Sequence, residues 1–593
     1  MKRFLLIAFS AVLCFASCKK DDENPIPDNP NTQPSDTTQT DTIQKPNPNS
    51  YRYLKTYVDR SLHPNFKFSG ALDVGEFNKN SNGVRDTVTA HFDEIVAGNA
   101  MKYSSVVDGS GNMNFTRVKQ FVNDAKAAGL TIFGHTLAWH SQQQPSYLLG
   151  LTADKEVEVP ENEKVDITDV EIKYSTLQSW NFWHSDFINA NDNTDYSITI
   201  EADGALIRNN TQSNQNYMVQ YQMANNLTTK FGTTYTMTVK MKASTAATVQ
   251  YSVGSWYPDN FNGSFKIDTE MKEYTVQFEP TVEGGFVLFQ TGSFVGDIVV
   301  ESLKITHKGS DKTIPLTAEQ KRDTLIWAMD RWIANMMEAT DGYVKAWDVV
   351  NEALSGGGND GSGNYVLQNY ENNNISDPSN VSSGVFYWQA FMGDLEYVRT
   401  AVASARKHFK GNADELKLFI NDYNLESDWD DNKKVRSLVN WIKKWEADGV
   451  TKIDGIGTQM HISCFESESI QKNIEKHIVE MFKIMAESGK LCRISELDMG
   501  YVRGTNRWGS SLKTNQLTEE EHQRMADFYE FIIKKYFEII PVEQQYGICQ
   551  WCLTDAPSNS GWRGGEPVGI WTEGFKARKA TYVGFAKGLA GEE

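Results

Sequence analysis

Strand-like and helical segments alternate along two parts of the chain, residues 51–151 and 313–593, and this rhythm leaves few possible folds. Short apolar runs such as 130–135 are typical of buried strands. The segment before that run carries Val118, Phe121 and Ala125 on one helical face. Repeated strand–helix–strand units of this length predict a parallel sheet. Eight strand-like runs can be placed, at residues 66–72, 92–102, 130–135, 343–352, 416–421, 453–459, 491–496 and 545–551.

The helical pattern disappears between these two parts, from residue 152 to residue 312. Apolar and polar residues alternate strictly there, as at Tyr235, Met237, Val239 and Met241, and Gly, Asn and Thr separate the alternating runs. Such a pattern is typical of the half-buried strands of an all-β sandwich. A stretch this long and uniform is not a loop. We therefore expect an inserted domain.

The two observations together define the fold class and the domains. Without the insert and the first 50 residues, about 380 residues with eight strand–helix units remain, which suits a TIM barrel with extended loops. The predicted class is α/β, a (β/α)8 TIM barrel with an inserted all-β sandwich domain. The predicted domains are a signal peptide at 1–18, a disordered tether at 19–50, a first barrel part at 51–151, the insert at 152–312 and a second barrel part at 313–593.

The N-terminal segment predicts export. Lys2 and Arg3 precede an apolar run at residues 4–13, which is typical of a secretory signal and too short to cross a membrane. A small residue then precedes Cys18, an arrangement that resembles a bacterial lipobox, in which the cysteine is lipidated. Residues 19–50 are rich in Pro, Asn, Thr and Asp and cannot bury a core. We expect an outer-membrane lipoprotein at the cell surface, with the lipid on Cys18 as its only membrane contact.

Composition excludes some partners. A net charge of −19 and a pI of about 5.1 argue against nucleic-acid and anionic-membrane partners. Cys549 and Cys552 have the C-x-x-C spacing of half a zinc site, but no second pair accompanies them, so two ordinary buried thiols are expected. Export permits disulfides, and Cys464 with Cys492 is the first pair to check. We expect no metal and no cofactor.

Acidic side chains stand at the ends of two separate strand-like runs. Glu352 ends one run and Glu496 the other, and either alone could be a solvated strand end. Two such acids are the minimum needed to hydrolyse a glycosidic bond, and barrel active sites lie where the strands end. The other strand ends supply side chains that suit sugar hydroxyls and sugar faces: Asn99, Lys102, His135, Trp139, Gln142, Asn351, Tyr423, Gln459, His461, Asp498 and Trp551.

Five of these strand ends form an ordered series of motifs. They are GHTLAWHSQ at 134–142, WDVVNE at 347–352, NDYN at 421–424, TQMH at 458–461 and ISELD at 494–498. The series resembles that of family 10 glycoside hydrolases, the retaining endo-β-1,4-xylanases, over residues 51–150 and 314–593.

The resemblance implies a role for each matched residue. Glu352 would be the acid/base and Glu496 the nucleophile, with His461 and Asp498 orienting and tuning Glu496. Asn351 would contact the substrate beside the acid. Further substrate contacts are implied on the non-reducing side of the cut, from Asn99, Lys102, His135, Trp139 and Gln142, with Trp551 and Trp562 covering them. The implied partners are xylan and xylo-oligosaccharides, bound by a monomer.

Chemistry sets opposite demands on the two acids. Glu352 has to stay protonated near neutral pH, which an apolar wall and the nearby charge of Glu496 would favour. Glu496 has to stay ionised, and we expect His461 and Gln459 to donate hydrogen bonds to it. In a retaining pair the carboxyl groups lie roughly 5–5.5 Å apart.

The insert resembles a carbohydrate-binding module of the family 4/22 type. The similarity rests on WNFW at 180–183, the alternating strands, and the ending at 296–303. Its position also resembles that in interrupted xylanases of gut Bacteroidota. The candidate glycan-binding aromatics are Trp183, Tyr217, Trp256 and Tyr257, each of which could equally fill the core.

Two alternatives remain open. Gly98 stands where the family usually has Glu, and Gln143 and Gln144 replace a single apolar residue, so the substrate-binding subsites could differ. The same fold could act on β-1,4-glucan as an endoglucanase. A non-catalytic glycan-binding surface lipoprotein is the other reading, although both glutamates are present.

Overall fold

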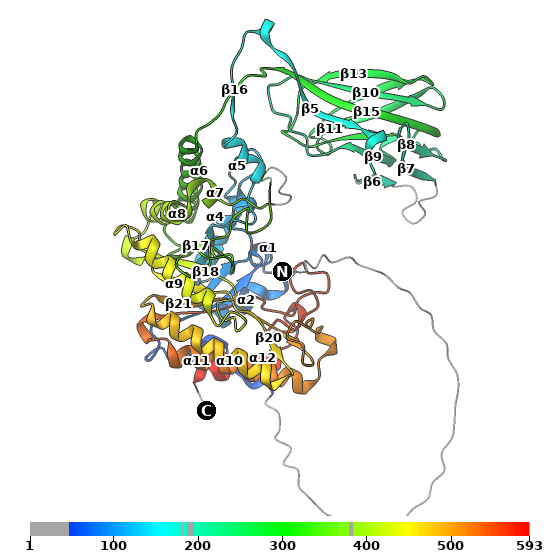
Figure 1. The fold of residues 1–593 in the computed structure, drawn as a ribbon. Coiled ribbons are helices and arrows are strands. Elements are labelled where there is room, and N and C mark those ends of the chain that lie inside the picture. The colour runs from blue at the N-terminus through cyan, green and yellow to red at the C-terminus, as the bar shows by residue number, and fades with distance from the viewer. Residues whose placement is uncertain (1–46, 181, 187–194, 377, 379–383, 592–593) are drawn as a thin grey trace, which may run out of the picture. The chain divides into compact units, whose positions relative to one another are not determined.

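The computed structural model describes residues 47–180, 182–186, 195–376, 378 and 384–591. The predicted signal peptide, Cys18 and most of the predicted tether lie outside these residues. The described chain contains a parallel barrel surrounded by helices and an antiparallel domain inserted into it (Figure 1). Among the described helices, none combines the length and apolarity needed to span a bilayer.

Eight parallel strands form the closed barrel. Each strand pairs with its neighbour in chain order, β19 pairs with β21, and β22 pairs with β1 to close the ring. All eight overlap the strand-like runs in the sequence, so the predicted barrel is confirmed. The strands are β1 (Lys67–Leu72), β2 (Glu94–Ala97), β3 (Thr131–Ala138), β17 (Ala346–Asn351), β18 (Lys417–Asp422), β19 (Gly455–Thr458), β21 (Leu491–Val502) and β22 (Gln545–Gln550). A short strand, β20 (His461–Phe465), pairs with the second half of β21.

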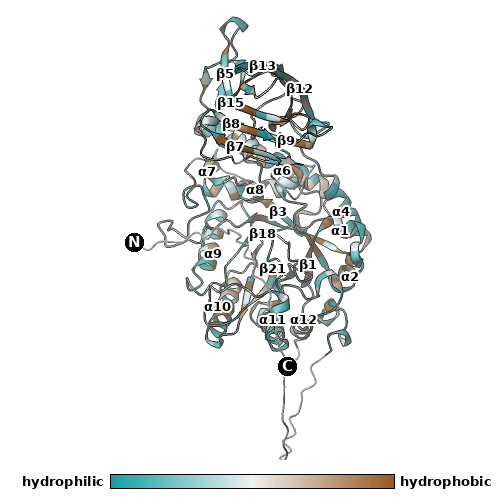
Figure 2. Cartoon of the chain, turned by 90° about the vertical axis from the view of Figure 1, so that its right-hand side faces the viewer, coloured by the Kyte–Doolittle hydropathy of each residue, from teal (hydrophilic) through white to brown (hydrophobic). Residues whose placement is uncertain are grey.

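Helices connect the strands and cover the barrel. Two of them begin with reciprocal side-chain caps, Thr317 with Gln320 at α6 and Thr518 with Glu521 at α11. The helices are α1 (Val74–Lys79), α2 (Val84–His91), α3 (Tyr103–Val106), α4 (Thr116–Ala127), α5 (Pro145–Leu151), α6 (Ala318–Thr340), α7 (Gln389–Met392), α8 (Asp394–His408), α9 (Lys433–Glu446), α10 (Glu468–Glu487), α11 (Glu519–Ile539) and α12 (Ala580–Ala590). Their outward faces are largely hydrophilic, as the teal colour of α4 shows in Figure 2.

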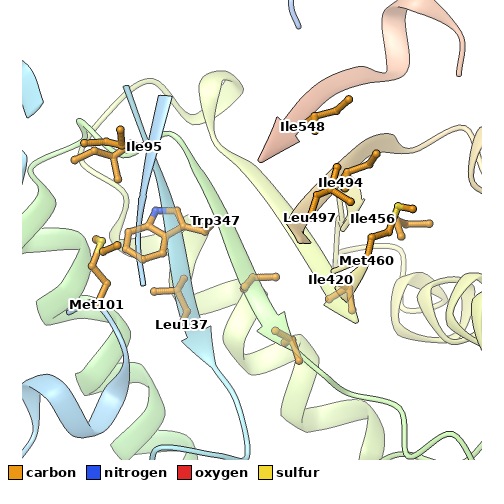
Figure 3. Close-up of a cluster of buried hydrophobic side chains, with 14 of the residues drawn as sticks. Ile95, Met101, Leu137, Trp347, Ile420, Ile456, Met460, Ile494, Leu497 and Ile548 are labelled. Carbon is orange, nitrogen blue, oxygen red and sulfur yellow. The ribbon is translucent and has the colours of Figure 1, made fainter. Parts of the chain in front are cut away.

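Strand alternation divides the barrel core into two clusters. The larger lies between the strands and the helices and includes the side chains drawn in Figure 3, among them Ile95, Ile548 and Trp347. The neighbours in sequence, Val96 and Cys549, point the other way and join a smaller cluster inside the ring. A Cβ at Gly134 would lie 2.1 Å from the Trp347 ring, so only glycine fits beside this tryptophan. The packed interior fixes the strand ends that carry the site.

The insert is a sandwich of two antiparallel sheets. One sheet has the order β13–β10–β15–β8–β7, with β5 also paired to β15, and the other has the order β12–β11–β14–β9–β6. The strands are β5 (Val165–Lys173), β6 (His184–Asp186), β7 (Tyr196–Glu201), β8 (Gly204–Asn209), β9 (Val219–Ala224), β10 (Tyr235–Ala243), β11 (Ala247–Gly254), β12 (Asn260–Ile267), β13 (Lys272–Phe278), β14 (Phe286–Gln290) and β15 (Gly296–Gly309). Every second residue of β10 is buried, as the sequence pattern predicts, and brown bands mark β8 and β15 in Figure 2.

Where the chain leaves and re-enters the barrel, two short strands pair with each other. These are β4 (Lys155–Glu156) and β16 (Thr313–Ile314), which follow α5 and precede α6. The sandwich lies between them in the sequence and has its own hydrophobic cluster. The sandwich is therefore a separately packed insertion between α5 and α6.

All four cysteines in the described part of the chain are unpaired thiols. Cys464 and Cys492 do not form a disulfide, and Cys549 is buried inside the ring while Cys552 is half-buried.

Candidate active site

A cleft of about 690 Å³ lies where the barrel strands end. It brings together most of the side chains that the sequence places at strand ends: Asn99, Lys102, Trp139, Gln142, Glu352, Gln459, His461, Glu496, Trp551 and Trp562. His135, Asn351, Tyr423 and Asp498 do not line this cleft. Three of those four contact a lining residue, and Tyr423 is the exception.

Glu496 is a buried carboxylate held in its ionised form. One oxygen accepts a hydrogen bond of 2.8 Å from Asn421 Nδ2, and the other lies 3.3 Å from His461 Nε2. Burial raises the pKa of Glu496, but the His461 hydrogen bond and the charge interactions with His135, His461 and Lys102 outweigh it and lower the pKa to about 2. The carboxylate is therefore available as a nucleophile at neutral pH.

His461 is the cation that holds Glu496. Its Nδ1 lies 2.9 Å from Asp498 Oδ2. Burial lowers the pKa of His461, yet the two carboxylates on either side of the ring raise it to about 10. Both ring nitrogens then carry protons and donate. This charge stabilises the fold fully below the ordinary pKa of 6.5, and the contribution is lost as the pH rises through about 10.

Asp498 fixes His461 from behind the cleft. It is fully buried, and its oxygens also accept hydrogen bonds from Trp562 Nε1 at 2.9 Å and Arg563 Nη1 at 2.6 Å. Burial raises the pKa of Asp498, while the charges of His461 and Arg563 bring it down to about 2. Trp562 was expected only to cover the substrate, but its hydrogen bond also helps to position Asp498.

Glu352 occupies a different setting, half-buried at the end of β17. Its backbone has a φ of +54°, a left-handed conformation that is rare outside glycine and is found at strained functional positions. Trp139 Nε1 donates to Oε2 at 2.9 Å, and Gln459 Nε2 donates to Oε1 at 2.9 Å. The expectation that Gln459 donates to Glu496 is therefore wrong. Asn421 makes that contact instead, reaching Glu496 from β18, although β19 lies between β18 and β21 in the ring.

Lys102 is a buried cation in the wall of the cleft. Its Nζ lies 4.9 Å from the Trp139 ring centre and donates to Asn99 Oδ1 at 3.2 Å. Burial lowers the pKa of Lys102, and the charges of Glu496 and Glu352 raise it. Gln142 donates to the same Asn99 oxygen at 3.3 Å, and its own Oε1 has no hydrogen-bond partner in the described chain. This wall offers amide and ammonium groups to a sugar.

His135 and Trp551 pack beneath the wall. His135 Nδ1 lies 2.9 Å from Asp348 Oδ2, and its ring meets Trp551 edge-on at 5.5 Å. His135 is buried, so it supports Trp551 and is not placed in the lining as expected. Asn351 is likewise buried, and its Nδ2 lies 3.4 Å from Glu352 Oε1.

The structure adds residues that the sequence did not single out. Lys434, on α9, forms a fully buried ion pair of 2.8 Å with Asp422 and lies 3.2 Å from the Tyr423 ring centre. Asp422 Oδ2 also accepts from the Leu354 backbone N–H, two residues after Glu352. A lysine on an amphipathic helix normally points to solvent, so the sequence did not predict a buried role for Lys434. Only its partner Asp422 belongs to a recognised motif, NDYN.

The candidate aromatics of the insert gather around a second hollow. Tyr217, Trp256 and Tyr257 line a pocket of about 670 Å³ on the five-stranded sheet, together with the amide side chains of Gln220, Gln250, Asn262 and Gln290. Trp183 does not line it, but packs edge-on against Trp256 with ring centres 5.2 Å apart. All four are solvent-exposed, with Tyr257 at 86%. They are therefore surface and not core residues.

Metal ligation finds no support among the described side chains, where no three His, Cys, Asp or Glu residues meet in a way that could hold an ion.

Comparison with known proteins gives consistent results for the barrel. The sequence profile described as Glycosyl hydrolase family 10 matches residues 58–191 and 311–586. Endo-beta-1,4-xylanase Xyn10C of Cellvibrio japonicus is 28% identical over 291 residues, covering 47% of this chain and 42% of that protein. Endo-1,4-beta-xylanase A of Cellvibrio japonicus (strain Ueda107) is 33% identical over 227 residues, covering 37% and 32%. The chain thus matches less than half the length of either relative.

A solved structure shares the fold. Native xylanase10C from Cellvibrio japonicus superposes with a TM-score of 0.51 at 19% identity, covering 93% of this chain and 75% of that one. The family profile matches more than half of the chain, and its gap falls within the insert between the two barrel parts. The chain belongs to glycosyl hydrolase family 10.

Proposed function

We propose that this chain hydrolyses internal β-1,4-xylosidic bonds of xylan with retention of configuration, Glu352 acting as acid/base and Glu496 as nucleophile. One observation carries the proposal: the two carboxyl groups face one cleft in opposite settings. Glu496 is buried and paired with a cation, whereas Glu352 is half-buried and bonded to neutral donors. The names of the two relatives support xylan as the substrate.

The settings suit a double displacement. Ionised Glu496 attacks the anomeric carbon, and Glu352 gives its proton to the departing glycosidic oxygen, which leaves a glycosyl ester on Glu496. Forming the ester removes the negative charge of Glu496, so Glu352 can then hold one. Glu352 takes a proton from water, whose oxygen attacks the anomeric carbon. The bond from that carbon to the Glu496 oxygen breaks, which releases the sugar and the Glu496 carboxylate. Lys102, Asn99 and Gln142 would hold the sugar beside the bond that breaks.

The insert is proposed to hold the same polysaccharide. Xylan is long and partly insoluble, so a module that binds it raises the substrate concentration at the cleft. Trp256, Tyr257 and Tyr217 present exposed rings beside amide groups, the combination that stacks on and hydrogen-bonds a neutral glycan. We also propose that Cys18 carries a lipid that keeps the enzyme on the outer membrane.

Replacing either glutamate should abolish most activity. Glu352→Ala is expected to lower kcat/KM on xylo-oligosaccharides by about 10²–10⁴-fold through loss of proton transfer, and Glu496→Ala by at least about a thousandfold. The control is Glu338→Ala, which removes an exposed carboxylate of α6 that pairs with Lys410. NMR of the first product from wild type should show the β-anomer.

Substrate choice is read in the same assays. Wild-type rates of xylo-oligosaccharide release from the Glu496→Ala protein would contradict the nucleophile assignment. A higher wild-type kcat/KM on cello-oligosaccharides than on xylo-oligosaccharides would favour an endoglucanase. Binding of xylo-oligosaccharides without any product would favour a non-catalytic protein.

Removing His461 should shift the pH dependence. In His461→Gln the hydrogen bond and positive charge that lower the pKa of Glu496 are gone, so that pKa rises. Because the nucleophile has to be ionised, the acidic limb of the kcat/KM profile should move to higher pH, and the maximum should fall. His408→Gln, which breaks the pair between His408 on α8 and Asp330 on α6, should leave the profile unchanged. An unmoved acidic limb in His461→Gln would contradict the proposed role.

The insert is tested by binding to insoluble xylan. The double variant Trp256→Ala with Tyr217→Ala should bind about tenfold more weakly, since two stacking faces are lost, while kcat/KM on short soluble xylo-oligosaccharides stays the same. Phe231→Ala removes an exposed aromatic of the insert that does not line the pocket, and should bind as wild type does. Equal binding by the double variant and wild type would refute the assignment.

Membrane attachment is tested by cell fractionation. The wild-type protein should sediment with outer membranes, and Cys18→Ala should be released from them, because the lipid is attached at that thiol. Identical partitioning of the two proteins would rule out a lipid anchor on Cys18.

A further inference from the structure

Two large exposed tryptophans lie together at the mouth of the barrel, outside the cleft described above. Trp429 is 51% exposed and Trp508 is 70% exposed, and their ring centres are 5.8 Å apart at 51°. Trp429 lies in the loop after β18 and Trp508 in the loop after β21. Both loops leave the carboxyl ends of their strands, the same end of the barrel that carries Glu352 and Glu496.

The two tryptophans are held in place by the partly buried ion pair between Arg507 and Asp428. The Arg507 guanidinium carbon lies 5.4 Å from the Trp429 ring centre and 4.9 Å from that of Trp508. Both terminal nitrogens of Arg507 bind the Asp428 carboxylate, whose side chain is only 2% exposed. Asn473 Nδ2 also donates to this carboxylate at 2.6 Å. The rings are thus fixed before any ligand arrives, which lowers the entropy cost of binding.

The order of the strands in the barrel shows where the two tryptophans lie relative to the proposed catalytic residues. The wall formed by Asn99, Lys102 and Gln142 belongs to the loops after β2 and β3. β18 and β21 both pair with β19 and lie on the other half of the ring. The loop after β18 also approaches the catalytic residues: Glu426 has its pKa raised by burial and lowered in part by the charge of His461.

We propose that Trp429 and Trp508 form a distal subsite that stacks on sugar rings of the xylan chain, on the opposite side of the scissile bond from the Asn99–Lys102–Gln142 wall. The occupant follows from the chemistry of the patch. Its rings offer flat apolar faces, and the Arg507 charge is already neutralised by Asp428, so the surface suits a neutral chain with C–H faces. This inference rests on the proposed hydrolysis of xylan.

The test compares substrates of increasing length. In the double variant Trp429→Ala with Trp508→Ala, kcat/KM on xylotriose should equal that of wild type, because a short chain does not reach the pair. On soluble linear xylan it should be about tenfold lower, the effect of losing two stacking faces. The products of xylohexaose cleavage should also change in ratio. Phenylalanine at both positions should restore much of the loss, since the ring faces return.

Trp327→Ala is the matched control. Trp327 is 52% exposed on α6 and also lies beside an arginine, Arg331, but on a helix at the flank of the barrel. It should leave all substrates unaffected. Equal kcat/KM for wild type and double variant on every chain length would overturn the subsite. Absence of wild-type hydrolysis would instead overturn the proposed function, and calorimetry with xylohexaose, compared between wild type and the double variant, would then decide the subsite by itself.

Discussion

The catalytic centre depends on the ion cluster formed by His461 between Glu496 and Asp498. Arg563 joins the cluster through Asp498 and also pairs with Glu566, so two cations face three carboxylates. Breaking one partner of such a buried group typically costs about 3–5 kcal/mol, because an uncompensated charge remains. Among the interactions that lower the pKa of each carboxylate, those with His461 are the largest. The ionisation of Glu496, the proposed nucleophile, its orientation and part of the local stability therefore share one cause.

The barrel makes this cluster possible and also tolerates the interruption. β20 and β21 run side by side, which places His461 beside Asp498 in register, and Glu496 lies two residues earlier. The sandwich enters and leaves through the β4–β16 pair, so its ends are already together, and the barrel pays almost no closure entropy for its length. Each domain buries its own apolar cluster. The insertion can therefore add a second domain without disturbing the strand ends.

The periodic hydrophobic pattern explains why the fold could be predicted from the sequence, whereas the side-chain contacts of the site could be predicted only in part. The eight strands and the inward residues of β10 follow from patterns that packing enforces over many residues. Hydrogen-bond partners depend instead on how side chains are placed across neighbouring strands. Gln459 therefore donates to Glu352 and not, as expected, to Glu496, which accepts from Asn421. The roles of Arg563 and Lys434 could not be predicted from the sequence, because a buried cation can be recognised only when the buried acid that it pairs with is known. Trp429 and Trp508 lie in loops, where no period exists.

Lys102 shows how the cleft can keep its charge constant through the proposed reaction. Its pKa is lowered by burial and raised by both Glu496 and Glu352, so it lies within reach of each. In the first step the charge of Glu496 disappears into the ester, and Glu352 becomes the carboxylate as its proton leaves. The negative charge thus moves from one carboxylate that interacts with the ammonium to the other. A fixed cation that interacts with both positions is favoured over water, because it stabilises either location without reorganising. The burial of Lys102 beside Trp139 is consistent with that requirement.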